Sequence, residues 1–322
     1  MKFFKNIFFV FGFLYLFFFS QVFAREKSQK LILHFDVNRT IIAIDPKGGR
    51  SLSDVLNYCL SEKYTYQWEE NIKKPISYYT YVYEYLLPGK LSDRNLKRKR
   101  TEKISSFLSF LYEKEHPLYT QIKKEYDLLM EKLKGGEIFI FPSFFLLLDK
   151  LEKKEIDFHL ILRSFGSEIQ EVIREIEKRY PSLKFSCFGQ FKKRELFLPK
   201  ENKKIQGIKN IYNIFTQHKC ISIQDDYFYW NSHEEKEEYG KMFPLNIFDK
   251  TTLSLFFDDH IIEEIPPPRN IVAPFDIMTE NSIPLRQMIQ EKKAFFVDTI
   301  QAILDDRYFI RRVKEAIDYK KN

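Results

Sequence analysis

The sequence predicts an α/β fold: a Rossmann-like parallel sheet flanked by helices, with a mostly helical, cap-like insertion after the first strand. Short apolar runs alternate with stretches whose apolar residues recur at helical spacing, which favours a parallel sheet covered by helices. Several runs end in polar or acidic residues, as strands do at the ligand-binding edge of an open α/β sheet. Residues 46–137 form too long a segment for one crossover and are interpreted as the insertion.

The composition is that of a globular protein. The chain has 322 residues, of which 44% are hydrophobic and 30% charged, enough for one large domain or one domain with an insertion. The formal net charge of +7 is modest for this length, so we expect no nucleic-acid partner. The densest basic run, Lys97–Arg100, is either a nucleic-acid or nuclear-import patch or a solvated loop or helix start, and a secretory N-terminus argues against import.

The N-terminus is typical of a signal peptide. Lys2 and Lys5 precede an apolar stretch, Ile7–Phe19, and a small residue, Ala24, closes a plausible cleavage site. The apolar stretch is shorter than the roughly 20 residues of a membrane-spanning helix. We therefore expect a signal peptide at 1–24 and an exported domain at 25–322, secreted or periplasmic, with no stable membrane span after cleavage. The alternative is an uncleaved N-terminal anchor.

The first strand is expected at Lys30–Phe35, followed by a turn at 46–49. Helical spacing and turn residues then divide the insertion. Its expected parts are a short helix at Leu52–Leu60, a tyrosine-rich segment at Tyr64–Tyr85, and two helices within 102–134 that break at His116–Pro117 and stop at Gly135–Gly136.

The rest of the chain predicts alternating strands and helices. The expected strands are Phe158–Leu162, Leu183–Phe188, Cys220–Ile223 and Ser254–Phe257, and the expected helices are Pro142–Leu151, Ser167–Tyr180 and a tail helix at 293–318. The three cysteines are widely spaced and lack a CxxC pair, so we expect buried thiols, with one disulfide possible, and no zinc site.

Polar residues that follow apolar runs carry the predicted chemistry. Asp36 ends the first run and is followed by Asn38 and Thr40, Ser164 ends the second, and the pair Asp258–Asp259 ends a late one. An aspartate at such a strand end can attack phosphorus and can bind a hard cation. Lys241 precedes the acidic pair and would place a positive charge beside a phosphate.

This order of residues resembles the haloacid dehalogenase superfamily of phosphatases and phosphotransferases over about residues 30–260, apart from the insertion. The matching positions are Asp36-Val-Asn-Arg-Thr40, Ser164, Lys241 and Asp258–Asp259. The resemblance implies that Asp36 is a nucleophile that forms an aspartyl-phosphate, and that Ser164 and Lys241 contact the phosphate. It also implies a Mg²⁺ site made by Asp36, the backbone carbonyl of Asn38, Asp258 and Asp259. The implied substrate is a phosphorylated small molecule or protein.

Asn38 departs from the family pattern, which usually has a second aspartate there to protonate the leaving group. An amide cannot transfer that proton, and general acid–base help is worth about 10²–10⁴-fold. Three outcomes remain: slow turnover of substrates with good leaving groups, a proton donor from the insertion, or binding without chemistry. We expect a slow Mg²⁺-dependent phosphohydrolase, with a catalytically inactive binding protein as the alternative and an interaction protein with a basic insertion as a third reading.

Several further residues have two interpretations each. Asp225–Asp226 follow the fourth expected strand and either lie near the site or belong to a turn. His260 follows the acidic pair and could reach the site. Trp68 and Trp230 either line a substrate entrance or pack in the interior. The insertion either screens the site from water or only adds packing.

Overall fold

The computed structural model describes residues 30–321, apart from 47, 91–92, 135–137 and 262–269. The expected signal peptide at 1–24 lies outside the described residues. Within the described part, none of the helices combines the length and the apolar character needed to cross a bilayer.

An eight-stranded sheet forms the centre of the molecule, in the order β12-β10-β1-β4-β8-β5-β6-β7. The first six strands of this order pair in parallel, and β6 and β7 extend the sheet antiparallel. The predicted fold class is therefore confirmed. The strand bounds are β1 Lys30–Asp36, β4 Phe158–Ser164, β5 Phe185–Lys192, β6 Glu195–Leu198, β7 Lys203–Ile205, β8 Cys220–Gln224, β10 Thr252–Asp258 and β12 Ala294–Phe296.

The register of the central strands brings the predicted site residues to one edge. Phe35 pairs with Phe257, so Asp36 and Asp258, one residue further along, end neighbouring strands at the same level. On the other side Asp36 pairs with Arg163, next to Ser164 at the end of β4. Parallel strands present such ends together at the carboxyl edge of the sheet.

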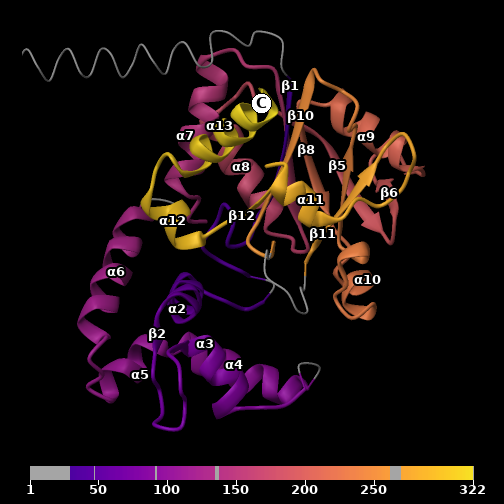
Figure 1. The fold of residues 1–322 in the computed structure, drawn as a ribbon. Coiled ribbons are helices and arrows are strands. Elements are labelled where there is room, and N and C mark those ends of the chain that lie inside the picture. The colour runs from indigo at the N-terminus through magenta and orange to yellow at the C-terminus, as the bar shows by residue number, and fades with distance from the viewer. Residues whose placement is uncertain (1–29, 47, 91–92, 135–137, 262–269, 322) are drawn as a thin grey trace, which may run out of the picture.

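Helices cover both faces of the sheet, as Figure 1 shows. One extended apolar core joins one face to α7, α8, α12, α13 and the insertion, and a second core joins the other face to α9 and to a short parallel strand pair, β9 and β11. The bounds are α7 Pro142–Lys153, α8 Ile169–Arg179, α9 Ile208–Gln217, α10 Tyr227–Ser232, η2 Glu237–Tyr239, β9 Lys241–Leu245, β11 Val272–Asp276, α11 Leu285–Gln290, α12 Thr299–Leu304 and α13 Tyr308–Lys321.

The insertion is mostly helical, as predicted, and lies to one end of the sheet (Figure 1). Its last two helices are separated at the expected break near His116–Pro117. Its side chains share the extended core with the sheet, so the insertion is packed against the α/β part. Its elements are α2 Leu52–Lys63, β2 Thr65–Tyr66, β3 Ile76–Ser77, α3 Tyr78–Tyr81, η1 Val82–Leu86, α4 Arg94–Ser105, α5 Phe107–Glu113 and α6 Tyr119–Lys132.

Two element predictions need correction. The tail at 293–318 is not one helix, because Ala294–Phe296 pairs with β10 as an edge strand and Asp298 then caps the new helix α12. The third expected strand, Leu183–Phe188, begins later and runs on to Lys192, because it continues along β8 and turns into β6. All three cysteines are buried and unpaired, so the expectation of buried thiols is confirmed.

Candidate functional site

A buried lysine joins the two acidic loops. Lys241 is 2% exposed, and its Nζ donates to Asp36 Oδ1 and, at 2.7 Å, to Asp258 Oδ2. Strand β9 places this side chain, since the Lys241 amide donates to the carbonyl of Ile271 at the start of the β11 pairing. Gly240 permits the approach, because an added Cβ would overlap that same carbonyl oxygen.

The charged groups of this cluster shift one another's pKa values. Burial and the repulsion of Asp258 and Asp259 raise the pKa of Asp36 well above its usual range, although Lys241 acts in the opposite direction. Burial alone would lower the pKa of Lys241, but Asp258 and Asp36 together raise it. The two aspartates thus favour the charged form of Lys241, which lies beside the residue that the sequence predicts as the nucleophile.

Asp259 occupies the other side of the acidic pair. Its side chain lies 3.0 Å from His260 Nδ1 and 3.3 Å from Arg39 Nε. Burial alone would raise the pKa of Asp259, but the charges of His260, Arg39 and Lys241 lower it to about 2. The same attraction raises the pKa of His260 to about 9, against the effect of its burial. His260 thus reaches the site, as its place directly after the acidic pair suggested.

The loop after β1 is held in place by its own hydrogen bonds. The amide of Ile41 donates to the carbonyl of Val37, and Arg39 adopts a left-handed conformation with φ of 60°. Thr40 Oγ1 accepts from the amide of Asp259 at 3.2 Å, and the hydroxyl of Thr299 donates to the Arg39 carbonyl at 2.6 Å. These contacts give Thr40 a structural role that ties the first acidic loop to the second.

Ser164 lies in the cluster but is completely buried. Its Oγ is 3.2 Å from Asn38 Oδ1, contacts Glu168 Oε1, and accepts from the amide of Gly166 at 2.9 Å. The amide nitrogen of Asn38 donates to the carbonyl of Ile44 at 3.1 Å. Both ends of the Asn38 side chain are therefore engaged, and the Ser164 hydroxyl is shared with a carboxylate.

Two important residues were not predicted. Arg39 bridges Asp259 to Glu62 of α2, 2.8 Å away, and its guanidinium lies over the ring of Tyr58, so it links the sheet to the insertion. Glu168 is 4% exposed, and its Oε2 has no hydrogen-bond partner among the described residues. The partners of Arg39 come from other elements, and only the DxNRT spacing could have drawn attention to it, whereas Glu168 contacts Ser164 four residues before it.

The acidic pair after β8 supports the site without entering it. Asp225 receives two hydrogen bonds from the buried guanidinium of Arg163, one of them at 2.9 Å. Asp226 caps α10 by accepting from the amide of Tyr229 at 3.0 Å, and it also accepts from the amide of Lys193 at 2.9 Å. The turn interpretation therefore holds for Asp226, whereas Asp225 is one half of a buried ion pair.

The donor set suits a hard cation. Ligand atoms of Asp258, Asp259 and His260 lie within 4.8 Å of one another. Asp259 Oδ2 is buried without a hydrogen-bond partner among the described residues, and the group nearest to balance its charge is Arg39 Nε at 3.3 Å. Carboxylate oxygens of this kind are the ligands that Mg²⁺ prefers. His260 was not among the predicted ligands, and the half-exposed Asn38 enters the predicted set only through its backbone carbonyl.

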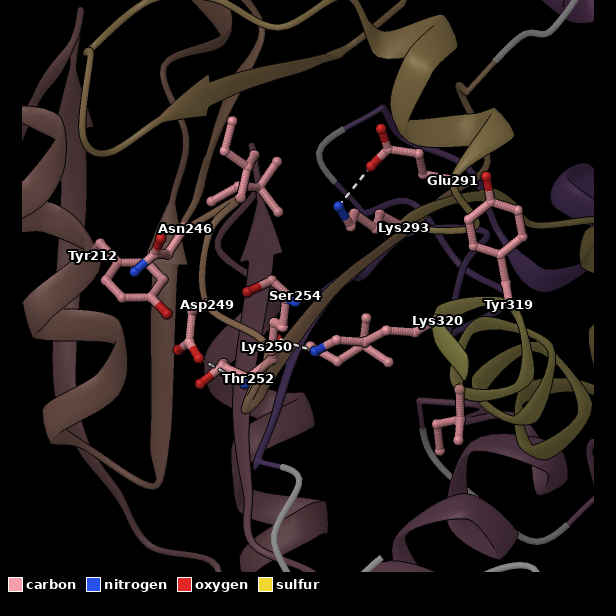
Figure 2. Close-up of a pocket in the computed structure, with 14 residues that line it drawn as sticks. Tyr212, Asn246, Asp249, Lys250, Thr252, Ser254, Glu291, Lys293, Tyr319 and Lys320 are labelled. Carbon is pink, nitrogen blue, oxygen red and sulfur yellow. Dashed lines mark hydrogen bonds and ion pairs between the residues drawn. The ribbon is translucent and has the colours of Figure 1, made fainter. Parts of the chain in front are cut away.

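A cavity of about 870 Å³ opens beside the acidic pair. Arg39, Asp259 and His260 form its inner end, and residues of α2, η1, α4, α10 and α12 form its walls. Another pocket, of about 600 Å³, lies at the opposite end of β10, around Thr252 (Figure 2). There Lys293 is paired with Glu291, and Lys320 donates to a backbone carbonyl, so both cations are satisfied by the protein.

No family model, no curated protein and no solved structure matches this chain.

Proposed function

We propose that the protein is a Mg²⁺-dependent phosphohydrolase that resembles the haloacid dehalogenase superfamily and acts through an aspartyl-phosphate on Asp36. The observation that best supports this proposal is the clamp of Lys241 between Asp36 and Asp258. A buried cation beside a strand-end carboxylate lowers the repulsion between that carboxylate and a phosphate dianion.

The proposed reaction has two displacement steps. An oxygen of Asp36 attacks phosphorus, the bond from phosphorus to the ester oxygen breaks, and the alcohol oxygen leaves with the electron pair. Water then attacks phosphorus and releases inorganic phosphate and the free Asp36 carboxylate. Lys241 holds positive charge beside the transferred group throughout. Asp36, Asp258 and Asp259, with the backbone carbonyl of Asn38, would hold Mg²⁺, which neutralises phosphate charge when bound.

Asn38 limits the rate in this proposal. The amide has no proton to give to the departing oxygen, and its two ends are already engaged by Ser164 and the Ile44 carbonyl. Turnover is therefore slow for alkyl esters, whose alkoxide leaving groups need protonation. The same locked amide favours the second candidate, a catalytically inactive protein that binds phosphorylated molecules in the same place.

The proposal includes export from the cytoplasm. It is supported by the basic start and the apolar stretch Ile7–Phe19, followed by Ala24 at a plausible cleavage site. N-terminal sequencing of protein recovered after secretion tests this part, and the expected first residue is Arg25. Recovery of a chain that still begins at Met1 in the membrane fraction would favour the anchor instead.

One assay tests the enzymatic proposal. Hydrolysis of an aryl phosphate is measured with Mg²⁺ and with a chelator, for the wild type, for Asp36→Ala and for the control Asp226→Asn. Asp226 lies outside the acidic cluster, and asparagine at this position can still cap α10. We expect Mg²⁺-dependent turnover that Asp36→Ala abolishes and Asp226→Asn leaves unchanged. We further expect Asn38→Asp to raise turnover, by up to about 10²-fold. Equal rates in wild type and Asp36→Ala would overturn the proposal.

A further inference from the structure

Aromatic side chains line two sides of the cavity beside the acidic pair. Tyr58, Tyr79 and Tyr83 line it from the insertion, and Tyr227 and Trp230 line it from α10. Its volume of about 870 Å³ is within the range of small-molecule sites, which bind mostly through apolar and aromatic walls. Trp230 borders the cavity but is 6% exposed and packs in a core cluster with Phe243, and Trp68 packs among insertion rings such as Tyr78, so the packing interpretation holds for both.

The three insertion tyrosines form one continuous wall. The ring centroids of Tyr58 and Tyr79 lie 5.3 Å apart in a T-shaped arrangement, and those of Tyr79 and Tyr83 lie 4.4 Å apart. All three side chains are half-buried, so part of each ring remains open to the cavity. Arg39 covers the inner end of this wall, over Tyr58. Because the Arg50 guanidinium also lies over Tyr58, 4.8 Å from the ring centre, a planar ring entering here would meet Tyr79 and Tyr83 on the insertion side.

Behind the opposite wall lie residues that contact the proposed nucleophile. Trp230 stacks on Phe165 with centroids 6.0 Å apart and an interplanar angle of 19°. Lys241 Nζ lies 5.1 Å from the centre of the Phe165 ring, and the same Nζ donates to Asp36. The cavity itself meets the acidic cluster at Asp259, the neighbour of Asp258, which Lys241 contacts; Asp36 and Lys241 are not among the residues that line it.

One basic residue of the cavity is available to an anion. Lys97 of α4 lines the cavity, is exposed, and has no ion-pair partner within the described ranges. The remainder of the basic run Lys97–Arg100 does not form a uniform patch, since Arg98 faces Glu102 and Arg100 is buried against the carbonyls of Leu87 and Gly89. This arrangement gives no support to a basic interaction surface.

We infer that the cavity binds the phenolic part of an aryl phosphate monoester, an inference that rests on the function proposed above. Two independent features lead to it. The walls are aromatic, and the residue that would protonate the leaving group is an amide. A phenol has a pKa near 10, so a phenolate can leave from phosphorus without a donated proton. The P–O(aryl) bond breaks as the Asp36–P bond forms, the phenolate takes its proton from solvent, and water later releases phosphate.

Binding and turnover are measured separately to test this inference. Phenylphosphonate and butylphosphonate, which cannot be hydrolysed, are titrated into the protein, and binding is followed by tryptophan fluorescence. The variant Trp230→Phe shows whether the fluorescence change comes from Trp230. The variants are Tyr79→Leu, in the aromatic wall, and Tyr319→Leu, a matched control in the pocket of Figure 2. We expect phenylphosphonate to bind more tightly, and Tyr79→Leu to weaken it by about three- to tenfold without changing butylphosphonate. Tyr319→Leu is expected to change neither.

The two proposals fail in different ways. Selective phenylphosphonate binding that Tyr79→Leu weakens supports the aromatic site even when no variant shows turnover, and in that case only the enzymatic proposal is lost. Equal binding of the two phosphonates, or equal effects of Tyr79→Leu and Tyr319→Leu, overturns the aromatic site even when Asp36-dependent turnover is present. Competition by phenyl phosphate and by a tyrosine-phosphorylated peptide then identifies whether the aryl phosphate is a small molecule or part of a protein.

Discussion

Replacing Lys241 by methionine tests the geometry of the acidic cluster without any assumption about substrate. Methionine nearly matches the length of the lysine stem but removes its charge and its hydrogen bonds. The lysine side chain is almost completely buried between Asp36 and Asp258, which are themselves buried. The substitution therefore leaves two carboxylates in the interior with no cation between them.

The expected cost follows from this burial. Removing one partner of a buried ion pair typically destabilises a protein by about 3–5 kcal/mol, because an uncompensated charge remains inside. That is a large fraction of the 5–15 kcal/mol by which domains are usually stable. The exposed pair of Lys219 and Glu152, 2.8 Å apart, provides the control, since Lys219→Met should cost no more than about 1 kcal/mol.

Urea titration followed by circular dichroism gives the free energy of unfolding of each variant. We expect Lys241→Met to lose about 3–5 kcal/mol, and the double variant Asp36→Asn/Lys241→Met to recover a substantial part of it by removing one unpaired charge. The reasoning is refuted by a Lys241→Met variant whose stability matches that of Lys219→Met, or by a double variant that is less stable than the single one.

Three further predictions concern other parts of the fold. Asp225→Leu should lower the free energy of unfolding by about 3–5 kcal/mol, because it leaves the buried Arg163 without its ion-pair partner. The double variant Asp225→Leu/Arg163→Met should recover part of this loss, and a loss below 1 kcal/mol in the single variant would contradict the buried pair. Gly240→Ala should destabilise by about 1–3 kcal/mol because its Cβ meets the backbone of Ile271, just before β11, and an unchanged urea midpoint would refute this. Burial, then the charge of Arg163, lowers the pKa of His34. As pH falls through about 6.5, the His34 side chain is protonated in the unfolded state but not in the folded state. The free energy of unfolding of wild type should therefore fall by about 1 kcal/mol relative to that of His34→Leu between pH 7.5 and 5.5, and parallel pH profiles of the two proteins would argue against this prediction.

The strands that carry the acidic residues were predictable from local pattern. Each of β1, β4 and β10 is a short apolar run that ends at a polar residue, and such runs are recognisable without tertiary information. The parallel register that brings Asp36 level with Asp258 then follows from the alternation of strands and helices.

The residues that complete the site were not predictable in the same way. Strand β9 contains both Lys241 and Pro244, and it exists because β11, far along the chain, pairs with it. Arg39 owes its position to Glu62 of the insertion and to Asp259 after β10. Such contacts depend on how distant elements pack, which a local sequence pattern does not encode.

The tail illustrates the same limit. Residues 293–318 have apolar residues at helical spacing, yet Ala294–Phe296 joins the sheet because the edge of β10 offers unsatisfied backbone groups to pair with. Asp298 then caps α12, and the chain turns again before Tyr308 to begin α13. A sheet edge is a property of the assembled fold, so it overrides the local helical preference.

The most direct test of the proposed centre is a crystal structure of the protein with Mn²⁺ in place of Mg²⁺ and beryllium fluoride in place of the phosphoryl group, with anomalous scattering used to locate the metal. We expect one manganese peak between Asp36 and the Asp258–Asp259 pair, and beryllium fluoride bonded to Asp36 beside Lys241. A metal peak elsewhere, or an Asp36 carboxylate that carries no fluoride adduct at saturating concentration, would contradict phosphoryl transfer at this aspartate.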